Sequence, residues 1–445
     1  MTTHEAMAAV GFCGEWIILT CDTKLVAVHT KQSREAFVFD CSAAEKKPKS
    51  TNEDHNRFMG TESRDIIMQC IGNVEVSQFV SSVISDDGAS EETGSDKILT
   101  FAVSPSGKLL ALTDDNKRLV LFHCEPSWRC ISVRCVVRRC TSLQFSHAED
   151  VLLAADKSGD VYSFSVVEPQ TEGELKMGHL SMLLAVTVSP DDRYIITADR
   201  DEKIRVSHLG TPYNIQSFCL GHQQFVSALL VPQSHPQWLL SGSGDGTVKL
   251  WEYESGRQLQ SWDLDELEET RSSDADRQKK PAVCRISCSP DARHLAVQCE
   301  RVSTLHFCSV EDEEKLVSRC RLPLPCCPLD VTFDPAGRLW VLMDCSDAPL
   351  RVYAHRGDSW ECDAESPELN RVTAAFKPHW DTLEASTRTN KRFEHLHKVS
   401  FDNVTAYLQK KQQRLEEQQL KRTKAQQANG KKKAKTETPE AATQS

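Results

Sequence analysis

Several features that mark membrane or secreted proteins are missing from this chain of 445 residues. It has no apolar run of the roughly 18 residues that a transmembrane helix needs, so we expect no membrane association. The first residues, MTTHEAMAAVGFCGEW, lack a basic flank before an apolar run and do not resemble a secretory signal. With 39% hydrophobic residues the chain can still build a core. We therefore expect a soluble protein of a reducing compartment.

Metal-binding spacing is also missing. The chain has 18 cysteines, but none are paired in the C-x-x-C spacing of a zinc ribbon or a thioredoxin-like site. They scatter along segments that alternate like strands. We interpret them as small buried hydrophobic residues and predict no metal site.

Common catalytic motifs are missing as well: there is no G-x-S-x-G, no H-E-x-x-H and no G-x-x-x-x-G-K-[ST]. The stretch GSGDG at 242–246 superficially resembles the glycine-rich loop with which methyltransferases bind S-adenosylmethionine. A helix must follow such a loop, whereas TVKLWEY, which follows here, alternates like a strand. We predict that the chain is not an enzyme and binds no cofactor.

What the chain does contain is a repeat. The segments LTDDNKRLVLF, AADKSGDVYSF, TADRDEKIRVS and SGSGDGTVKLW begin at residues 112, 154, 197 and 241, and each joins a polar turn to an alternating, β-branched run. An apolar strand precedes each of them. A strand–turn–strand unit with a period of about 40 to 45 residues is typical of propeller blades.

One repeat resembles the WD-repeat family closely. Gly221-His222 opens it and Trp251-Glu252 closes it. In that family a His, a Ser or Thr, an Asp and a Trp form a buried hydrogen-bonded frame. The resemblance assigns this structural role to His222, Ser241 or Ser243, Asp245 and Trp251.

Weaker copies at 16–40, 283–310 and 328–355 complete seven blades. We predict an all-β fold, a seven-bladed WD-repeat β-propeller with a basic helical C-terminal tail. The predicted divisions are a first blade at 1–42, an acidic and polar insertion at 43–96, blades two to seven at 97–360 and a post-propeller segment at 361–399. A short packed element within the first insertion is left open, and a second polar insertion is expected at 263–280.

The turn of the fourth blade is unusually charged, with six charged residues between 199 and 205. The family frame requires only Asp201 there, with Thr197 as its partner. The other charges suit either a solvated hairpin or a surface that fixes the register of a partner. Ile204 and Val206 alternate with Arg205, so we expect the Arg205 side chain to face outward.

The C-terminal region is basic although the whole chain has a net charge of −11. Ser400 or Asp402 can cap a helix at 400–425, followed by a disordered tail at 426–445. One apolar stripe is formed by Phe401, Val404, Leu408 and Leu415. The basic residues Lys410, Lys411 and Arg414 suit RNA contact, or belong to a solvated helix. The basic pair at 421–422 and the basic cluster KKKAK at 431–435 resemble a bipartite nuclear localisation signal.

Several stretches resemble one branch of the WD-repeat family, the vertebrate non-catalytic subunit of the tRNA guanine-N7 methyltransferase. They are ALTDDNKRL, DKSGDVYSFSV, TADRDEKIRVS, SGDGTVKLWEYESGRQL and FDNVTAYLQKK, and the likeness runs from about residue 36 to 420. It implies a heterodimer with a separate S-adenosylmethionine-dependent catalytic subunit, tRNA bound through the complex, and a nuclear protein, with cytoplasmic presence left open. The docking residues that it implies are Lys157, Arg200, Asp201, Glu202, Lys203 and Arg205.

The alternative is a substrate receptor of a cullin-type ubiquitin ligase. Such WD-repeat receptors carry a W-D-x-R ending, and this chain has WEYE at 251–254. The match is poor.

Overall fold

The computed structural model describes residues 8–43, 94–264, 280–311, 315–345, 347–357, 359–379, 393–398 and 407–416. The chain divides into two compact units, Met1–His397 and Lys398–Ser445. Most of the two predicted insertions lies outside the described residues, and so does the predicted tail at 426–445. No helix among the residues that the structure describes is long and apolar enough to cross a membrane.

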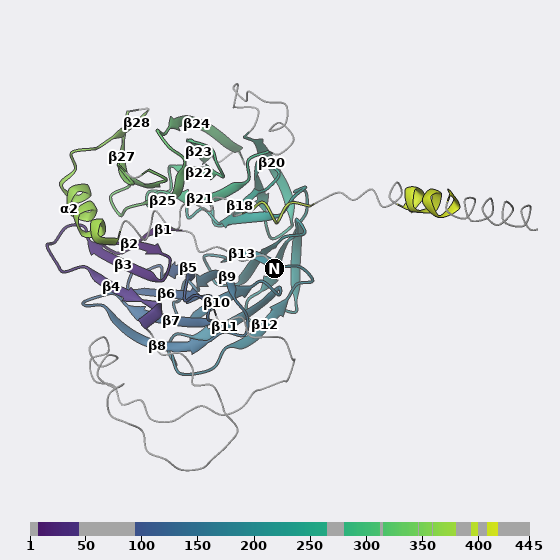
Figure 1. Ribbon diagram of the computed structural model, residues 1–445, viewed down its shortest axis with the longest axis horizontal. Coiled ribbons are helices and arrows are strands. Elements are labelled where there is room, and N and C mark those ends of the chain that lie inside the picture. Colours follow the sequence, from purple (N-terminus) through teal and green to yellow (C-terminus); the bar gives the residue numbers. More distant parts are fainter. Residues whose placement is uncertain are drawn as a thin grey trace, which may run out of the picture. The chain divides into compact units, whose positions relative to one another are not determined.

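The first unit is built from seven four-stranded antiparallel sheets arranged in a ring (Figure 1). This confirms the predicted seven-bladed propeller. Each blade consists of four strands that are consecutive in the chain. Blade one contains β1 (Ala9–Cys13), β2 (Trp16–Cys21), β3 (Lys24–His29) and β4 (Phe37–Asp40), and blade two contains β5 (Ile98–Val103), β6 (Leu109–Asp114), β7 (Arg118–His123) and β8 (Arg129–Cys135). Blade three contains β9 (Cys140–Phe145), β10 (Val151–Asp156), β11 (Asp160–Ser165) and β12 (Glu174–Gly178). Blade four contains β13 (Leu183–Val188), β14 (Tyr194–Asp199), β15 (Ile204–His208) and β16 (Ile215–Cys219).

Blades five to seven contain β17 (Val226–Leu230), β18 (Trp238–Ser243), β19 (Thr247–Glu252), β20 (Arg257–Asp263); β21 (Val283–Cys288), β22 (Leu295–Cys299), β23 (Thr304–Glu311), β24 (Lys315–Pro323); β25 (Pro328–Phe333), β26 (Leu339–Met343), β27 (Leu350–Arg356), β28 (Ser359–Cys362). In every blade the last strand is the outer edge of the sheet.

In four blades the turn between the first two strands has a similar sequence: SPSGK, SPDDR, SPDAR or DPAGR. The fourth residue of each turn has a left-handed backbone, at φ 68° for Gly107, 55° for Asp192, 56° for Ala292 and 80° for Gly337. Glycine adopts this conformation without strain and aspartate tolerates it. Ala292 is the strained member of the set.

The core lies between neighbouring blades. On the second and third strands of blade four, Ile196 and Val206 pack in one cluster with Leu239 and Trp251 of blade five. The opposite face of the same sheet, with Ile195, packs against blade three. A sheet that is buried on both faces reads as a continuous apolar run, which is the pattern of YIITA in β14.

Closure between blades seven and one uses a helix that the sequence analysis did not predict. Helix α2 (Pro367–Phe376) follows the last blade and continues into the short 3-10 turn η4 (Lys377–His379). Its buried residues Leu369, Val372 and Phe376 join one cluster with side chains of blades one and seven. The Val10 amide also donates to Asp330 Oδ2 at 2.9 Å across this seam. Within the described residues each sheet uses strands from one continuous stretch, so these contacts close the ring.

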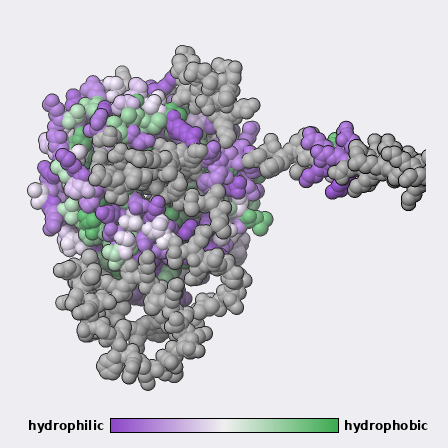
Figure 2. All heavy atoms as spheres, in the orientation of Figure 1, coloured by the Kyte–Doolittle hydropathy of each residue, from purple (hydrophilic) through white to green (hydrophobic). Residues whose placement is uncertain are grey.

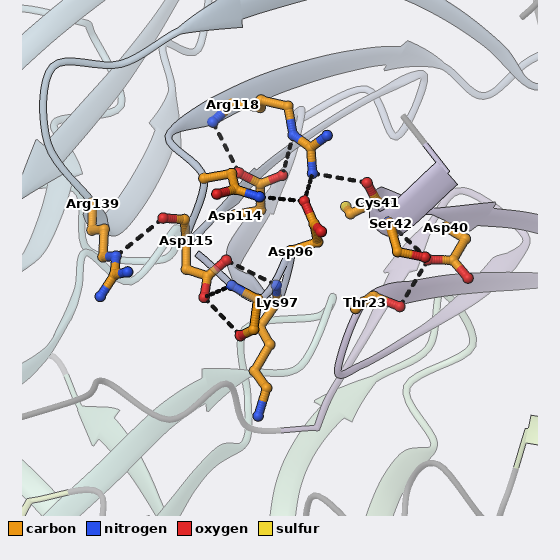
Figure 3. Close-up of polar contacts among 12 residues, drawn as sticks. Thr23, Asp40, Cys41, Ser42, Asp96, Lys97, Asp114, Asp115, Arg118 and Arg139 are labelled. Atoms are coloured by element: carbon orange, nitrogen blue, oxygen red, sulfur yellow. Dashed lines mark hydrogen bonds and ion pairs between the residues drawn. The ribbon is translucent and has the colours of Figure 1, made fainter. Parts of the chain in front are cut away.

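The ends of the first insertion are held together by one guanidinium (Figure 3). Arg118 Nη2 donates to the Cys41 carbonyl at 2.8 Å and to Asp96 Oδ1 at 2.7 Å. Its Nε donates to Asp114 Oδ2 at 2.6 Å. Cys41 comes before residues 44–93 and Asp96 comes after them, so Arg118 fixes both the exit and the re-entry of the chain. A short 3-10 turn, η1 (Cys41–Ala43), begins at the exit.

We expect substitution of α2 at the seam to weaken the whole propeller. Phe376→Ala removes a ring that is 1% exposed and leaves a cavity, which costs about 3–5 kcal/mol. Thermal or urea unfolding, followed by far-ultraviolet circular dichroism, measures the change. The exposed residue Thr373 on the same helix supplies the control, because Thr373→Ala should change the free energy of unfolding by no more than about 0.5 kcal/mol. Equal effects of the two substitutions would mean that α2 does not close the ring.

Candidate partner-docking surface

The polar frame of blade five lies where the WD-repeat resemblance places it. His222 Nδ1 is 3.0 Å from Asp245 Oδ2, and His222 Nε2 is 2.7 Å from Ser241 Oγ. The Trp251 indole N–H donates to the same Ser241 oxygen at 2.8 Å. These distances fit an imidazole that donates from Nδ1 and accepts at Nε2. Burial alone would raise the pKa of Asp245, but hydrogen bonds from His222 and Thr247 hold it well below its usual range.

Blade four has the corresponding histidine contacts, but a different aspartate makes one of them and Ser207 stands where blade five has Trp251. His179 Nδ1 is 3.1 Å from Asp199 Oδ2, and His179 Nε2 is 2.8 Å from Thr197 Oγ1. The expectation that Asp201 fills this role is therefore wrong. Asp199 ends strand β14 and is 2% exposed, whereas Asp201 lies two residues further on in a partly exposed turn. The Lys203 amide donates to Asp199 at 3.0 Å and closes the turn over the buried carboxylate.

The predicted docking charges lie in and beside this turn. Lys203 is exposed and its ammonium reaches the Asp201 carbonyl at 3.4 Å. Glu202 has a left-handed backbone with φ 69°. Arg200 is partly buried. Lys157 is exposed in the equivalent turn of blade three, between β10 and β11. The structure therefore places these residues on corresponding turns of two adjacent blades.

Arg205 is less accessible than the sequence alternation suggested. Its side chain is on the face of β15 opposite Ile204 and Val206, as expected, but it is only partly exposed. Its Nη1 donates to the Gly178 carbonyl at the end of β12, at 3.0 Å, so it lies at the seam between blades three and four. Burial lowers the pKa of Arg205. Within the described parts of the chain, its buried Nε has no hydrogen-bond partner.

Exposed apolar residues lie on the outer strands and connections of the same two blades and were missed in the sequence analysis. Among the described residues of the propeller unit, ten large hydrophobic side chains are exposed, and seven of them lie between 167 and 220. Leu180 is fully exposed, and Phe218 lies directly opposite Arg205 in the β15–β16 pairing. We name this set the apolar rim: Leu175, Leu180, Tyr213, Ile215, Phe218 and Leu220.

Contiguous exposed apolar surface on a folded protein commonly marks a binding site. The sequence signal for the apolar rim is weak. NIQSFCLGH reads as an ordinary strand, and only its position as the outer edge of blade four exposes Ile215 and Phe218.

The second unit contains a helix over residues 407–416, drawn in yellow in Figure 1. Lys410, Lys411 and Arg414 are all exposed on it, together with Leu408 and Leu415 of the predicted stripe. The face visible in Figure 2 is mostly hydrophilic along this helix. The predicted caps Ser400 and Asp402, the other stripe residues and both basic clusters of the localisation signal lie outside the described residues.

No group of three or more His, Cys, Asp or Glu side chains suited to a metal ion occurs in the described parts of the chain. Polar clusters in these parts include the blade frames, the network around Arg118, and the group formed by Asp334, Arg338 and Trp340.

Solved structures with the same architecture are unrelated in sequence. The RRP9 WD40 repeats superpose with a TM-score of 0.55 at 16% identity, covering 77% of this chain and 88% of that chain. A chain of the mitotic checkpoint complex superposes with a TM-score of 0.57 at 12% identity, covering 80% of this chain and 92% of that chain. Fold and frame together define a WD-repeat propeller.

Sequence relatives identify the branch of the WD-repeat proteins to which the chain belongs. Residues 15–175 and 165–364 match the family described as the tRNA methyltransferase TRM82 WD40 domain. The tRNA (guanine-N(7)-)-methyltransferase non-catalytic subunit wdr4 of Danio rerio is 52% identical, over 97% of this chain and 98% of its own length. The Homo sapiens protein of the corresponding name is 41% identical, over 90% and 89%. The chain belongs to this family of non-catalytic WD-repeat subunits.

Removing Asp199 should destabilise blade four, and removing Asp201 should not. Asp199→Ala leaves His179 and the Lys203 amide without their acceptor, at a cost of about 1–3 kcal/mol. Although burial raises the pKa of Asp199, hydrogen bonds from His179 and Lys203 give it a net lowering. Its contribution is therefore complete above the ordinary carboxyl pKa and disappears as the pH falls through the lowered value. Urea unfolding at neutral pH and near pH 3 measures both effects, with Asp201→Ala as the matched control. A larger loss for Asp201→Ala would restore the original assignment.

Proposed function

We propose that this chain is the non-catalytic subunit of a tRNA guanine-N7 methyltransferase, binding and stabilising a separate catalytic subunit. Its relatives bear that name over nearly their whole length. The observation that supports docking at blades three and four is that both the charged turn and the apolar rim belong to these two blades.

The two parts of this surface supply different terms of the binding free energy. Exposed apolar side chains gain roughly 25 cal/mol for each Å² that they bury against a partner. Charged groups set orientation and rate of association more than affinity. Leu180 and Phe218 would therefore provide most of the affinity, and Lys203 and Glu202 the register.

Arg205 has a particular place in this arrangement. One of its nitrogens already bonds Gly178, and its Nε lacks an acceptor among the described residues. A docked partner would remove the remaining water from the guanidinium, and a desolvated cation without acceptors is costly. The catalytic subunit should therefore bring a carboxylate or carbonyl oxygen to this position.

The helix at 407–416 would contribute to tRNA binding. Its exposed Lys410, Lys411 and Arg414 can each neutralise a phosphate and release counterions. Nuclear localisation, through the basic clusters at 421–422 and 431–435, remains part of the proposal. A role as a cullin-type substrate receptor is not favoured, because the relatives are named for the methyltransferase and the WEYE ending departs from W-D-x-R.

Substitutions in the docking surface should separate binding from folding. Leu180→Asp removes a fully exposed apolar residue, so the melting temperature should stay within about 2 °C while affinity for the catalytic subunit falls at least tenfold. Lys203→Glu should weaken association most at low salt. Co-purification and isothermal titration with the recombinant catalytic subunit measure both.

Val137, which is exposed outside the apolar rim, provides the control. Val137→Asp should leave both melting temperature and affinity unchanged. Wild-type affinity of Leu180→Asp and Lys203→Glu together would exclude blade four as the docking surface.

Removing the charges on the helix should weaken tRNA binding without changing the binding of the catalytic subunit. Changing Lys410, Lys411 and Arg414 to Gln removes up to three phosphate contacts, so the slope of log K against log salt for tRNA binding by the assembled complex should fall by about 2 to 3. Affinity for the catalytic subunit should not change. Gln412→Ala with Gln413→Ala is the matched control on the same helix, expected to leave the slope intact. An unchanged slope in the charge variant would identify the helix as solvated.

A further inference from the structure

A short segment after the propeller lies on the blades beside the charged turn. We name residues 393–397 the strap. Phe393 is 4% exposed and Leu396 is 1% exposed, so two of its five residues are as buried as core residues. The Phe393 ring stacks on Phe225 with centroids 5.4 Å apart, and His397 meets the edge of the same ring at 5.1 Å.

The strap bridges three blades. Its apolar residues pack in one cluster with side chains at or next to the start of the first strand of blades four, five and six: Met182, Leu184, Phe225, Ala282 and Cys284. The Phe393 amide donates to Glu300 Oε1, in the turn of blade six, at 3.3 Å. These strand starts and the turns between second and third strands lie on one face of the ring, which is the face that carries the charged turn.

A hydrogen bond joins the strap to the charged turn itself. Arg200 Nε donates to the Leu396 carbonyl at 3.4 Å, while the Arg200 amide donates to the Met182 carbonyl at 2.9 Å. Both the backbone and the guanidinium of Arg200 are therefore held in place. Burial and the neighbouring Arg200 charge lower the pKa of His395.

We propose that the strap positions Arg200 for docking of the catalytic subunit, and so forms part of the binding apparatus although it is about 190 residues away in sequence. The inference rests on the proposed function. An unrestrained arginine loses rotamer freedom when it binds, and that loss reduces affinity. The Leu396 carbonyl removes the freedom beforehand, and the stacked Phe393 and Phe225 rings hold the carbonyl in place.

A double-mutant cycle in the full-length chain tests this proposal. Phe393→Ser should release the strap and weaken binding of the catalytic subunit about tenfold, and Phe393→Leu, which keeps apolar contact, should restore most of the affinity. Arg200→Met should weaken binding by a similar factor. If the strap acts through Arg200, the double variant should lose little more than either single variant, because the two residues belong to one unit.

The outcomes are distinguishable. Wild-type affinity of either Phe393→Ser or Arg200→Met, or losses that multiply in the double variant, would overturn the proposal. A purely stabilising strap would lower the melting temperature and leave affinity unchanged at 10 °C. If Phe393→Ser does not fold, chains ending at residue 399 and at residue 392 replace it, and equal affinity of the two chains would exclude the strap.

A different result is expected if blade four is not the docking surface. In that case Leu180→Asp also binds the catalytic subunit with wild-type affinity. If Leu180→Asp abolishes binding while Phe393→Ser leaves it intact, blade four is the docking surface and only the strap is excluded.

Discussion

The packing of one blade against the next is the interaction on which this structure depends. The middle strands of a blade carry apolar side chains on both faces of the sheet, and only the two neighbouring blades can cover them. An open row of seven sheets would leave two such faces in water. The ring must therefore close. Here the seam is filled by apolar side chains of blades one and seven and of α2, and the hydrogen bond from Val10 to Asp330 crosses it.

A closed ring makes the turns at its faces stiff and places them at fixed intervals. This explains how a short polar turn can serve as a binding element. In blade four the buried pair of His179 and Asp199 anchors the base of the turn, while Arg200 and Lys203 extend from it. In the proposed arrangement, stability and recognition are divided between neighbouring residues, since alternate positions of the chain face the interior and the surface.

Much of this architecture could be predicted from periodicity, because turns such as SPDDR recur in four blades and apolar strands such as YIITA recur along the chain. The blade-five frame was identifiable for the same reason. Asp199 was misassigned because blade four has aspartates at both 199 and 201, and only the geometry of β14 decides between them.

Helix α2 does have a local signal that the sequence analysis missed, since Pro367 begins it and its buried residues 369, 372 and 376 follow helical spacing. The strap depends on contacts between distant segments, such as Phe393 with Phe225, and the apolar rim depends on which strands form the edges of the blades. No local pattern encodes these two features.

The shared anchorage of Cys41 and Asp96 on Arg118 has a consequence for how this chain can vary. Because both ends are fixed at one point, a flexible segment of any length at this junction would add only the entropy of closing a loop. That entropy grows slowly, by about 0.6 kcal/mol for each doubling of length. The junction between blades one and two can therefore accept segments of very different size, or an entire inserted domain, with almost no change in the stability of the ring.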